Sequence, residues 1–264
     1  MLTEVKNQFK VILLSVKYNI MWEMTNHVTF ATNILFMILN NAIFIIQWFI
    51  LFHLKDNIGG YKMEEVLILW GLAASTFGFA HIFFHMAFDI PDLIIGGKLD
   101  SFLVQPKNVL LGVITSGTST SAIGDLIYGY IILCIFRFSP VNLLLFTVLT
   151  ITGGLILTSF AVIMGSISFW IVKGDIISSN FIGLMINMST YPDGIFKGVV
   201  RVLLYSIIPV GLVIYLPIRL IISFRVWYLL VILAFTVFMV WLAFFIFYKG
   251  LKRYSSSNLM SARV

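Results

Sequence analysis

The sequence has 264 residues, of which 60% are hydrophobic and only 11% are charged, and its formal net charge is +6. Such a chain has too few polar side chains to cover a soluble domain of this length, so we expect a polytopic membrane protein. Continuously apolar runs favour membrane helices over the alternating strands of a barrel. The basic residues lie outside or beside these runs and indicate topology and lipid contact rather than a nucleic-acid partner.

Residues 1–27 are predicted to form an amphipathic helix that lies in the membrane interface. Apolar residues recur at spacings of three and four, while Lys6, Lys10 and Lys17 share the opposite face. The apolar run is too short for a signal peptide, and no small-residue cleavage site follows it. An ordinary amphipathic helix packed on the rest of the protein explains the same pattern, and both interpretations place the helix on one side of the bilayer.

Six membrane spans are predicted after this helix. A crossing needs about 20 apolar residues, and only the fifth run is clearly shorter. The fold class is therefore all-α, with a six-helix transmembrane domain over 28–250 and a cytoplasmic tail at 251–264. The predicted spans are 28–52, 66–88, 116–136, 143–172, 176–188 and 227–248.

The longest polar interruption of the chain lies at 89–108. Pro91 is expected to open a helix and Gly96-Gly97 to break it, after which an apolar side forms on a second turn. A compact loop of this kind predicts a docking element for a partner. The residues assigned to it are Asp89, Pro91, Asp92, Gly97, Lys98, Leu99, Asp100, Phe102, Leu103 and Pro106.

Three ionisable residues are candidates for a translocation path. Asp125 lies inside the third predicted span, where a carboxylate that faces lipid is costly, so it should face a polar cavity or a partner helix. The hydroxyl-rich run at 116–121 equally allows Asp125 to be interfacial. His81 and His85 precede Asp89 at spacings of four, which could hold a metal, but a polar stripe at the membrane boundary explains the row better and no metal is predicted.

The segment 191–225 is predicted to be a re-entrant pair of half-helices before the last span. Its prolines and its internal arginine do not suit a lipid-facing helix. A broken backbone is permitted at membrane depth where protein or water covers it. The residues that mark this segment are Tyr191, Pro192, Phe196, Arg201, Pro209 and Pro217.

Orientation follows from the basic residues. Most of the 17 Lys and Arg residues fall on the side that holds both termini, the 89–115 loop and the 173–175 turn. Both termini are therefore predicted to be cytoplasmic.

The order of these elements resembles the membrane subunit of a type 2 ATP-binding-cassette exporter, the ABC-2 family. Ile94-Ile-Gly-Gly-Lys-Leu-Asp-Ser-Phe-Leu-Val-Gln-Pro106 is similar to the G-x-L-D-x-x-L-x-x-P stretch of one branch of that family. Tyr191-Pro192-x-x-Ile-Phe196, with Ile208-Pro209 and Tyr215-Leu-Pro217, is similar to its re-entrant signature. The first motif departs from the pattern in having Gly-Lys before Leu-Asp where an acidic residue is usual, and Gln105 where a basic residue is usual.

The resemblance implies that 89–108 is a coupling helix seated in a nucleotide-binding subunit. It also implies a second permease copy, identical or related, that encloses a path in a bacterial plasma membrane for drugs, antimicrobial peptides or lipid-like molecules. The sequence contains no Gly-x-x-x-x-Gly-Lys-Ser/Thr loop, so no cofactor is expected in this chain, and ATP and Mg²⁺ would be bound by the partner.

Two alternatives compete with this interpretation. An ion-coupled secondary transporter is favoured by Asp125 and the histidines, but it would normally show matched broken helices in two repeated halves, and here only the C-terminal half is broken. An intramembrane enzyme would need a nucleophile–base pair or a metal set, for which the chain offers one His pair and scattered Ser.

Overall fold

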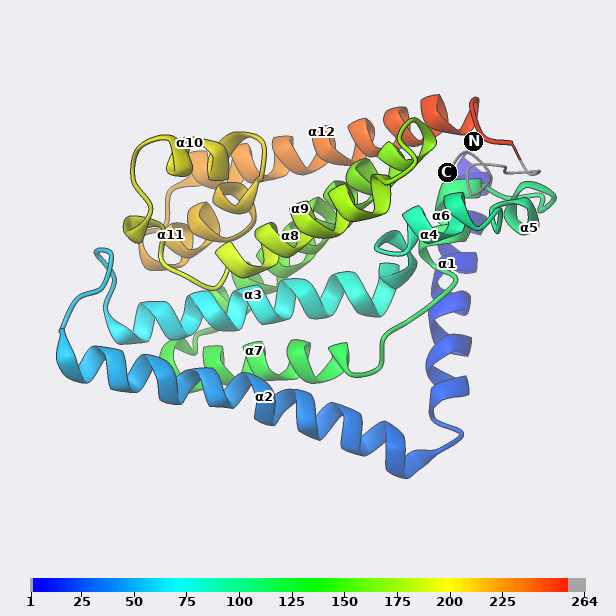
Figure 1. The fold of residues 1–264 in the computed structure, drawn as a ribbon. Coiled ribbons are helices and arrows are strands. Elements are labelled where there is room, and N and C mark those ends of the chain that lie inside the picture. Colours follow the sequence, from blue (N-terminus) through cyan, green and yellow to red (C-terminus); the bar gives the residue numbers. More distant parts are fainter. Residues whose placement is uncertain (1, 256–264) are drawn as a thin grey trace.

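The computed structural model describes residues 2–255, and this part of the chain is helical, with a single isolated bridge in the 55–62 hairpin. Six longer helices run side by side as a bundle, and the N-terminal helix lies across one end of it (Figure 1). The start of α1 and the end of α12 are both at that end. The helices are α1 (Leu2–Glu23), α2 (His27–Leu54), α3 (Met63–Phe84), α7 (Ala122–Arg137), α8 (Pro140–Ser166), α9 (Gly174–Met188) and α12 (Val226–Leu251).

Four helical stretches are long and apolar enough to cross a membrane, namely His27–Leu54, Met63–Ile95, Pro140–Phe169 and Val226–Leu251. A bent pair of short helices makes a fifth if it is counted as one span. Helices α7 and α9 have only 16 and 15 residues, below the roughly 20 that a crossing needs. The structure therefore confirms an all-helical, multi-pass protein, but it does not confirm the predicted count of six spans.

The third span begins later than the sequence predicted. Residues 115–121 are not helical, because their hydroxyls bind backbone carbonyls and compete with the helix. The Thr115 Oγ1 donates to the carbonyl of Leu111, and the Ser116 Oγ donates to that of Val113, both at 2.7 Å. Helix α7 starts after this loop, so Asp125 lies in its first turn and not deep in a span that begins at Ser116.

Three short helices gather beside α1 at the end that holds the termini (Figure 1). Val16 of α1 is buried there against Ile82 and Ala122, and the Ser15 hydroxyl donates to the Thr115 carbonyl at 2.7 Å. Helix α1 is thus fastened to the bundle as well as lying across it. The short helices are α4 (Ile90–Ile95), α5 (Asp100–Leu103) and α6 (Val109–Ile114).

The opposite end of the bundle holds the 55–62 hairpin and the segment that precedes α12. Helix α10 (Gly198–Ser206) is followed by a π-helical turn, Gly211–Tyr215, which continues as α11 (Leu216–Ile222). The two parts meet at 77°, with Pro209 at the break. Pro217, which was expected to break a helix, instead lies inside the continuous stretch, where the wider π turn before it accommodates a residue that has no N–H donor.

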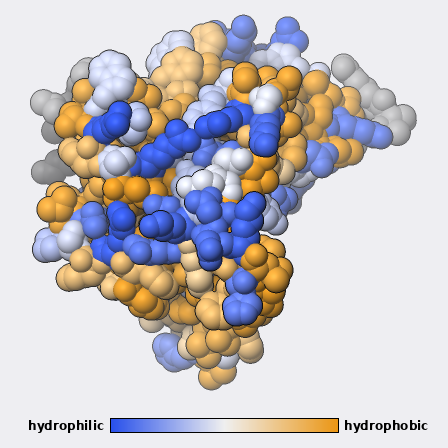
Figure 2. Space-filling model, turned by 90° about the vertical axis from the view of Figure 1, so that its left-hand side faces the viewer, coloured by the Kyte–Doolittle hydropathy of each residue, from blue (hydrophilic) through white to orange (hydrophobic). Residues whose placement is uncertain are grey.

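Hydrophilic side chains cover the middle of this end face, and hydrophobic ones surround them (Figure 2). The exposed large hydrophobic residues lie mainly along the flanks of the bundle, above all on α2 and α12. In the best 18-residue windows of these two helices only 11% and 22% of the residues are buried. A belt of apolar flanks with a polar end is the surface that a bilayer requires.

Helices α3 and α7 pack closely through glycines. A Cβ atom placed on Gly129 would lie 1.9 Å from the Ser75 Oγ and 2.2 Å from the Gly71 carbonyl oxygen. Only glycine permits this approach, as is common between membrane helices. The contact holds α7, and with it Asp125, against the buried helix α3.

Candidate functional site

The loop at 89–108 forms two short helices, as the prolines and glycines predict. Pro91 lies in the first turn of α4, and Gly97 ends that helix with a φ of +66°. The Lys98 N–H donates to the Leu93 carbonyl at 2.9 Å, which closes a glycine-terminated helix end and turns the chain back toward the bundle. The next residue, Leu99, is therefore directed into the core.

The outward face of the loop differs from the one that the sequence indicated. Leu99 is fully buried and Phe102 is half-buried, whereas Leu103 and Val104 are 41% and 83% exposed. Leu103, at the end of α5, and Val104, just after that helix, are thus available to a partner. Leu99 is not. The other assigned residues that are exposed are Asp92, Lys98 and Pro106, while Asp89, Gly97 and Asp100 are half-buried and Pro91 is buried.

The end of α12 packs beside this loop. The ring of Tyr254 lies 6.3 Å from that of Phe169, which also contacts Phe247 of α12. Two causes raise the pKa of the Tyr254 hydroxyl to about 12: its burial, which has the larger effect, and the nearby Asp100 carboxylate. The tyrosine is therefore neutral at physiological pH and lies close to α5. The cytoplasmic tail predicted for 251–264 lies outside the described residues from 256 onward.

Asp125 lines a cavity of about 450 Å³ inside the bundle. The Asn41 side chain of α2 donates to its Oδ1 at 2.6 Å, whereas Oδ2 is buried and has no hydrogen-bond partner. The walls come from α2, α3, α7, α8, α9 and the residues around the π turn. They are Met37, Asn40, Asn41, Phe44, Trp70, Ala73, Ala74, Thr76, Phe77, Asp125, Leu157, Met185, Ile186, Asn187, Ser189, Thr190, Tyr191, Val213 and Ile214.

The two candidate histidines lie elsewhere. The ring of His81 stacks between those of Phe77 and Phe88, at 3.8 and 4.0 Å between centroids, and its Nδ1 is 3.1 Å from the Phe77 carbonyl. The α-helix ends at Phe84, so His85 is in a 3-10 turn and no straight row continues to Asp89. Within residues 2–255, no group of three or more His, Cys, Asp or Glu could hold a metal. Neither histidine lines the cavity with Asp125.

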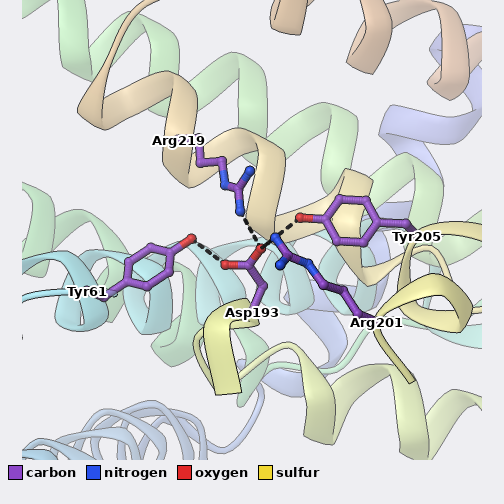
Figure 3. A network of polar contacts seen from close by, with 5 residues as sticks. All are labelled: Tyr61, Asp193, Arg201, Tyr205 and Arg219. Carbon is purple, nitrogen blue, oxygen red and sulfur yellow. Dashed lines mark hydrogen bonds and ion pairs between the residues drawn. The ribbon is translucent and has the colours of Figure 1, made fainter. Parts of the chain in front are cut away.

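Asp193 is the centre of a polar network at the other end of the bundle (Figure 3). Its Oδ1 accepts from the Tyr61 hydroxyl at 2.8 Å, and its Oδ2 accepts from the Tyr205 hydroxyl at 3.0 Å. Arg201 and Arg219 both form ion pairs with Oδ2. The Asp193 side chain is 1% exposed, so two cations and two hydroxyls compensate its removal from water. Burial raises the pKa of Tyr61, which keeps its hydroxyl a donor.

The remaining marked residues of 191–225 lie around this network. Tyr191 lines the cavity, and its ring meets that of Trp48 edge-on at 6.0 Å. Pro192 is buried and Phe196 packs on the core. A Cβ on Gly194 would lie 1.8 Å from the Gly59 carbonyl oxygen, so the 55–62 hairpin rests directly on this segment.

A family model described as ABC-2 family transporter protein matches residues 37–258, which include every helix from α3 to α12 and most of α2. The chain belongs to the ABC-2 family. It is therefore the membrane component of an ABC transporter, as the resemblance predicted. No curated protein and no solved structure matches this ABC-2 chain.

Sequence reasoning about this ABC-2 chain missed Asp193, Tyr61 and Asn41. A signal for Asp193 was present, because an arginine within an apolar segment needs a carboxylate, and Asp193 lies eight residues before Arg201. The partnership of Asn41 with Asp125 joins positions 84 residues apart and leaves no local pattern.

Proposed function

We propose that this chain is the permease subunit of an ABC exporter in a bacterial plasma membrane. It moves an amphipathic or hydrophobic substrate, such as a drug, an antimicrobial peptide or a lipid-like molecule, out of the cell. The observation that carries the proposal is the cavity around Asp125, in a chain of the ABC-2 family. Mostly apolar walls with a few polar groups are typical of sites for small amphipathic ligands.

A separate ATPase subunit binds ATP and Mg²⁺ and drives the cycle from the end that holds the termini. The exposed pair Leu103 and Val104 supports docking there, and Tyr254, which lies near Asp100 of the loop and against Phe169, supports a connection from the docking loop to α12. Both termini are then cytoplasmic, and α1, which lies across the bundle end, rests in the membrane interface (Figure 1).

The outer end of the permease is then the one that carries the 55–62 hairpin and the Asp193 network. In this arrangement α7 and α9, although shorter than a full crossing, complete six crossings as part of the bundle, and the bent pair at 198–222 enters and leaves from the outer face. Its two ends, beside α9 and α12, both lie at that end of the bundle, which supports a re-entrant path (Figure 1). A second permease copy, identical or related, covers part of the apolar flank and encloses the path.

The test is ATP-dependent accumulation of a fluorescent amphipathic dye in inside-out vesicles that contain the chain and its ATPase. A partner ATPase with an inactivated phosphate loop is the control. Export predicts uptake that needs ATP hydrolysis and survives an ionophore that collapses the proton gradient. Uptake that the ionophore abolishes and ATP does not restore would identify an ion-coupled secondary transporter instead, the alternative that a buried Asp125 favours.

A further inference from the structure

The cavity contains one charged side chain and no compensating cation. Asp125 is 5% exposed, and no Lys, Arg or His is among the described residues that line the space around it. An ionised carboxylate in such a place is costly unless it is paired. The only hydrogen bond to it from a described side chain is that of the Asn41 amide, and it reaches one carboxylate oxygen only.

The free oxygen of Asp125 marks where a cationic ligand would bind. Oδ2 is buried and lacks a partner, although it belongs to a residue that lines the cavity. An ammonium or guanidinium group would donate a charge-assisted hydrogen bond to it, which is among the stronger polar contacts in proteins. The amide of Asn41 already orients the carboxylate, so the acceptor is held in place before the ligand arrives.

Aromatic rings form much of the wall beyond this carboxylate. Phe44, Trp70, Phe77 and Tyr191 all line the cavity, and the rings of Phe44 and Trp70 lie 4.3 Å apart. Such rings pack against apolar groups and attract cations at their faces. The volume of about 450 Å³ is that of a site for a small molecule or one segment of a larger one.

We propose that this cavity selects an amphipathic cation, whose ammonium group binds Asp125 and whose apolar body packs against the aromatic wall. The inference rests on the proposed function, because it names the class of substrate that the exporter takes. Two sources carry the same chemistry: a soluble amphipathic amine and the primary ammonium of an aminolipid headgroup.

The experiment compares two fluorescent probes on the full chain in nanodiscs of phosphatidylglycerol. Dansylcadaverine carries a primary ammonium, and its N-acetylated form is neutral but otherwise similar. After subtraction of empty nanodiscs, the wild-type chain should bind the cation at least about tenfold more tightly than the neutral form, as expected for a hydrogen bond to a charged group. Asp125→Asn keeps the shape of the side chain and should bind the two probes equally.

Asp175→Asn is the matched control, because Asp175 is a half-buried carboxylate in the first turn of α9 and does not line the cavity. It should keep the wild-type preference. Equal binding of both probes by the wild type would overturn the inference, and so would a preserved preference in Asp125→Asn. The comparison of the two probes on the wild-type chain tests the inference even if the variants fail to fold.

A second arm separates the two sources of the ammonium group. If phosphatidylethanolamine in the nanodisc weakens binding of dansylcadaverine, the aminolipid headgroup is a ligand; if it does not, the ligand is a soluble amine. Both results support an ammonium site. ATP-dependent uptake of both probes into inside-out vesicles tests the exporter itself, so a failed charge preference and a failed export function give different results.

Discussion

Arg219 donates to the Oδ2 of Asp193 from the far side of the bend that separates α10 from α11. Arg201 reaches the same oxygen from α10, and Tyr61 reaches the other oxygen from the 55–62 hairpin. One carboxylate thereby holds together three segments that are separate in sequence. The arginines are 47% and 39% exposed, so water screens part of each ion pair.

Asp193→Asn should destabilise this end of the bundle. The variant keeps an oxygen for Tyr61 but leaves Arg201 and Arg219 without a counter-charge. Breaking a fully buried pair costs about 3–5 kcal/mol. Because the arginines are partly exposed, we expect a loss of about 1–3 kcal/mol in the free energy of unfolding. Thermal unfolding in detergent measures it, with Asp175→Asn as the control, and an unchanged midpoint would contradict a stabilising role.

Two substitutions in the loop at 89–108 should separate an effect on docking of the ATPase from an effect on folding. Val104→Asp places a charge on a residue that is already exposed, so the protein should insert at normal yield while ATP hydrolysis and transport become uncoupled. Leu99→Asp buries a carboxylate in the core and should lower the yield of folded protein. Yield, co-purification of the ATPase and transport are measured for both. Normal transport by Val104→Asp would remove this surface from the coupling path.

Cysteine labelling tests the re-entrant path. In a Cys134→Ser background, Lys197→Cys and Arg225→Cys should both react with an impermeant reagent added to intact cells, because both positions are exposed at the end of the bundle that the proposed topology places outside. Lys173→Cys, at the opposite end, should react only after the cells are opened. If positions 197 and 225 react from opposite sides, the bent pair is a true span and the topology changes.

A pair of glycine variants tests the contact of α3 with α7. In Gly129→Ala the new methyl group would clash with Ser75 and Gly71, so stability should fall by about 1–3 kcal/mol. Gly183→Ala is the matched control inside α9, where a Cβ meets nothing within 4 Å and alanine is the better helix former. It should leave stability unchanged or raise it by up to about 1 kcal/mol. Equal unfolding temperatures for the two variants would show that the close approach is not needed.

The features that could be predicted from the sequence are those that depend on local pattern. The helical class, the turn at Pro91 and Gly97, and the break at Pro209 follow from hydrophobicity and backbone chemistry, and the family match confirms the ABC-2 resemblance. The predicted start of the third span at Ser116 is too early, because 115–121 is a hydroxyl-rich run whose side chains bind backbone carbonyls instead of continuing a helix.

Other features depend on which side chains meet. The inward direction of Leu99 follows from a single glycine with positive φ, which no apolar spacing reveals. Asn41 and Asp125 come together only because α2 packs on α7, so the partner of a predicted residue could not be found from its neighbours in the chain.

The Asp193 network also sets an order in the biosynthesis of the protein. Tyr61 is made 132 residues before the carboxylate that binds it. At 5–20 residues per second, ribosomes need roughly 7–26 s to cover that distance. Throughout this interval the 55–62 hairpin has been made, but the segment on which it rests has not. The Tyr61 hydroxyl lacks its Asp193 partner during that time, and a nascent chain that stops before Asp193 cannot form the network at all.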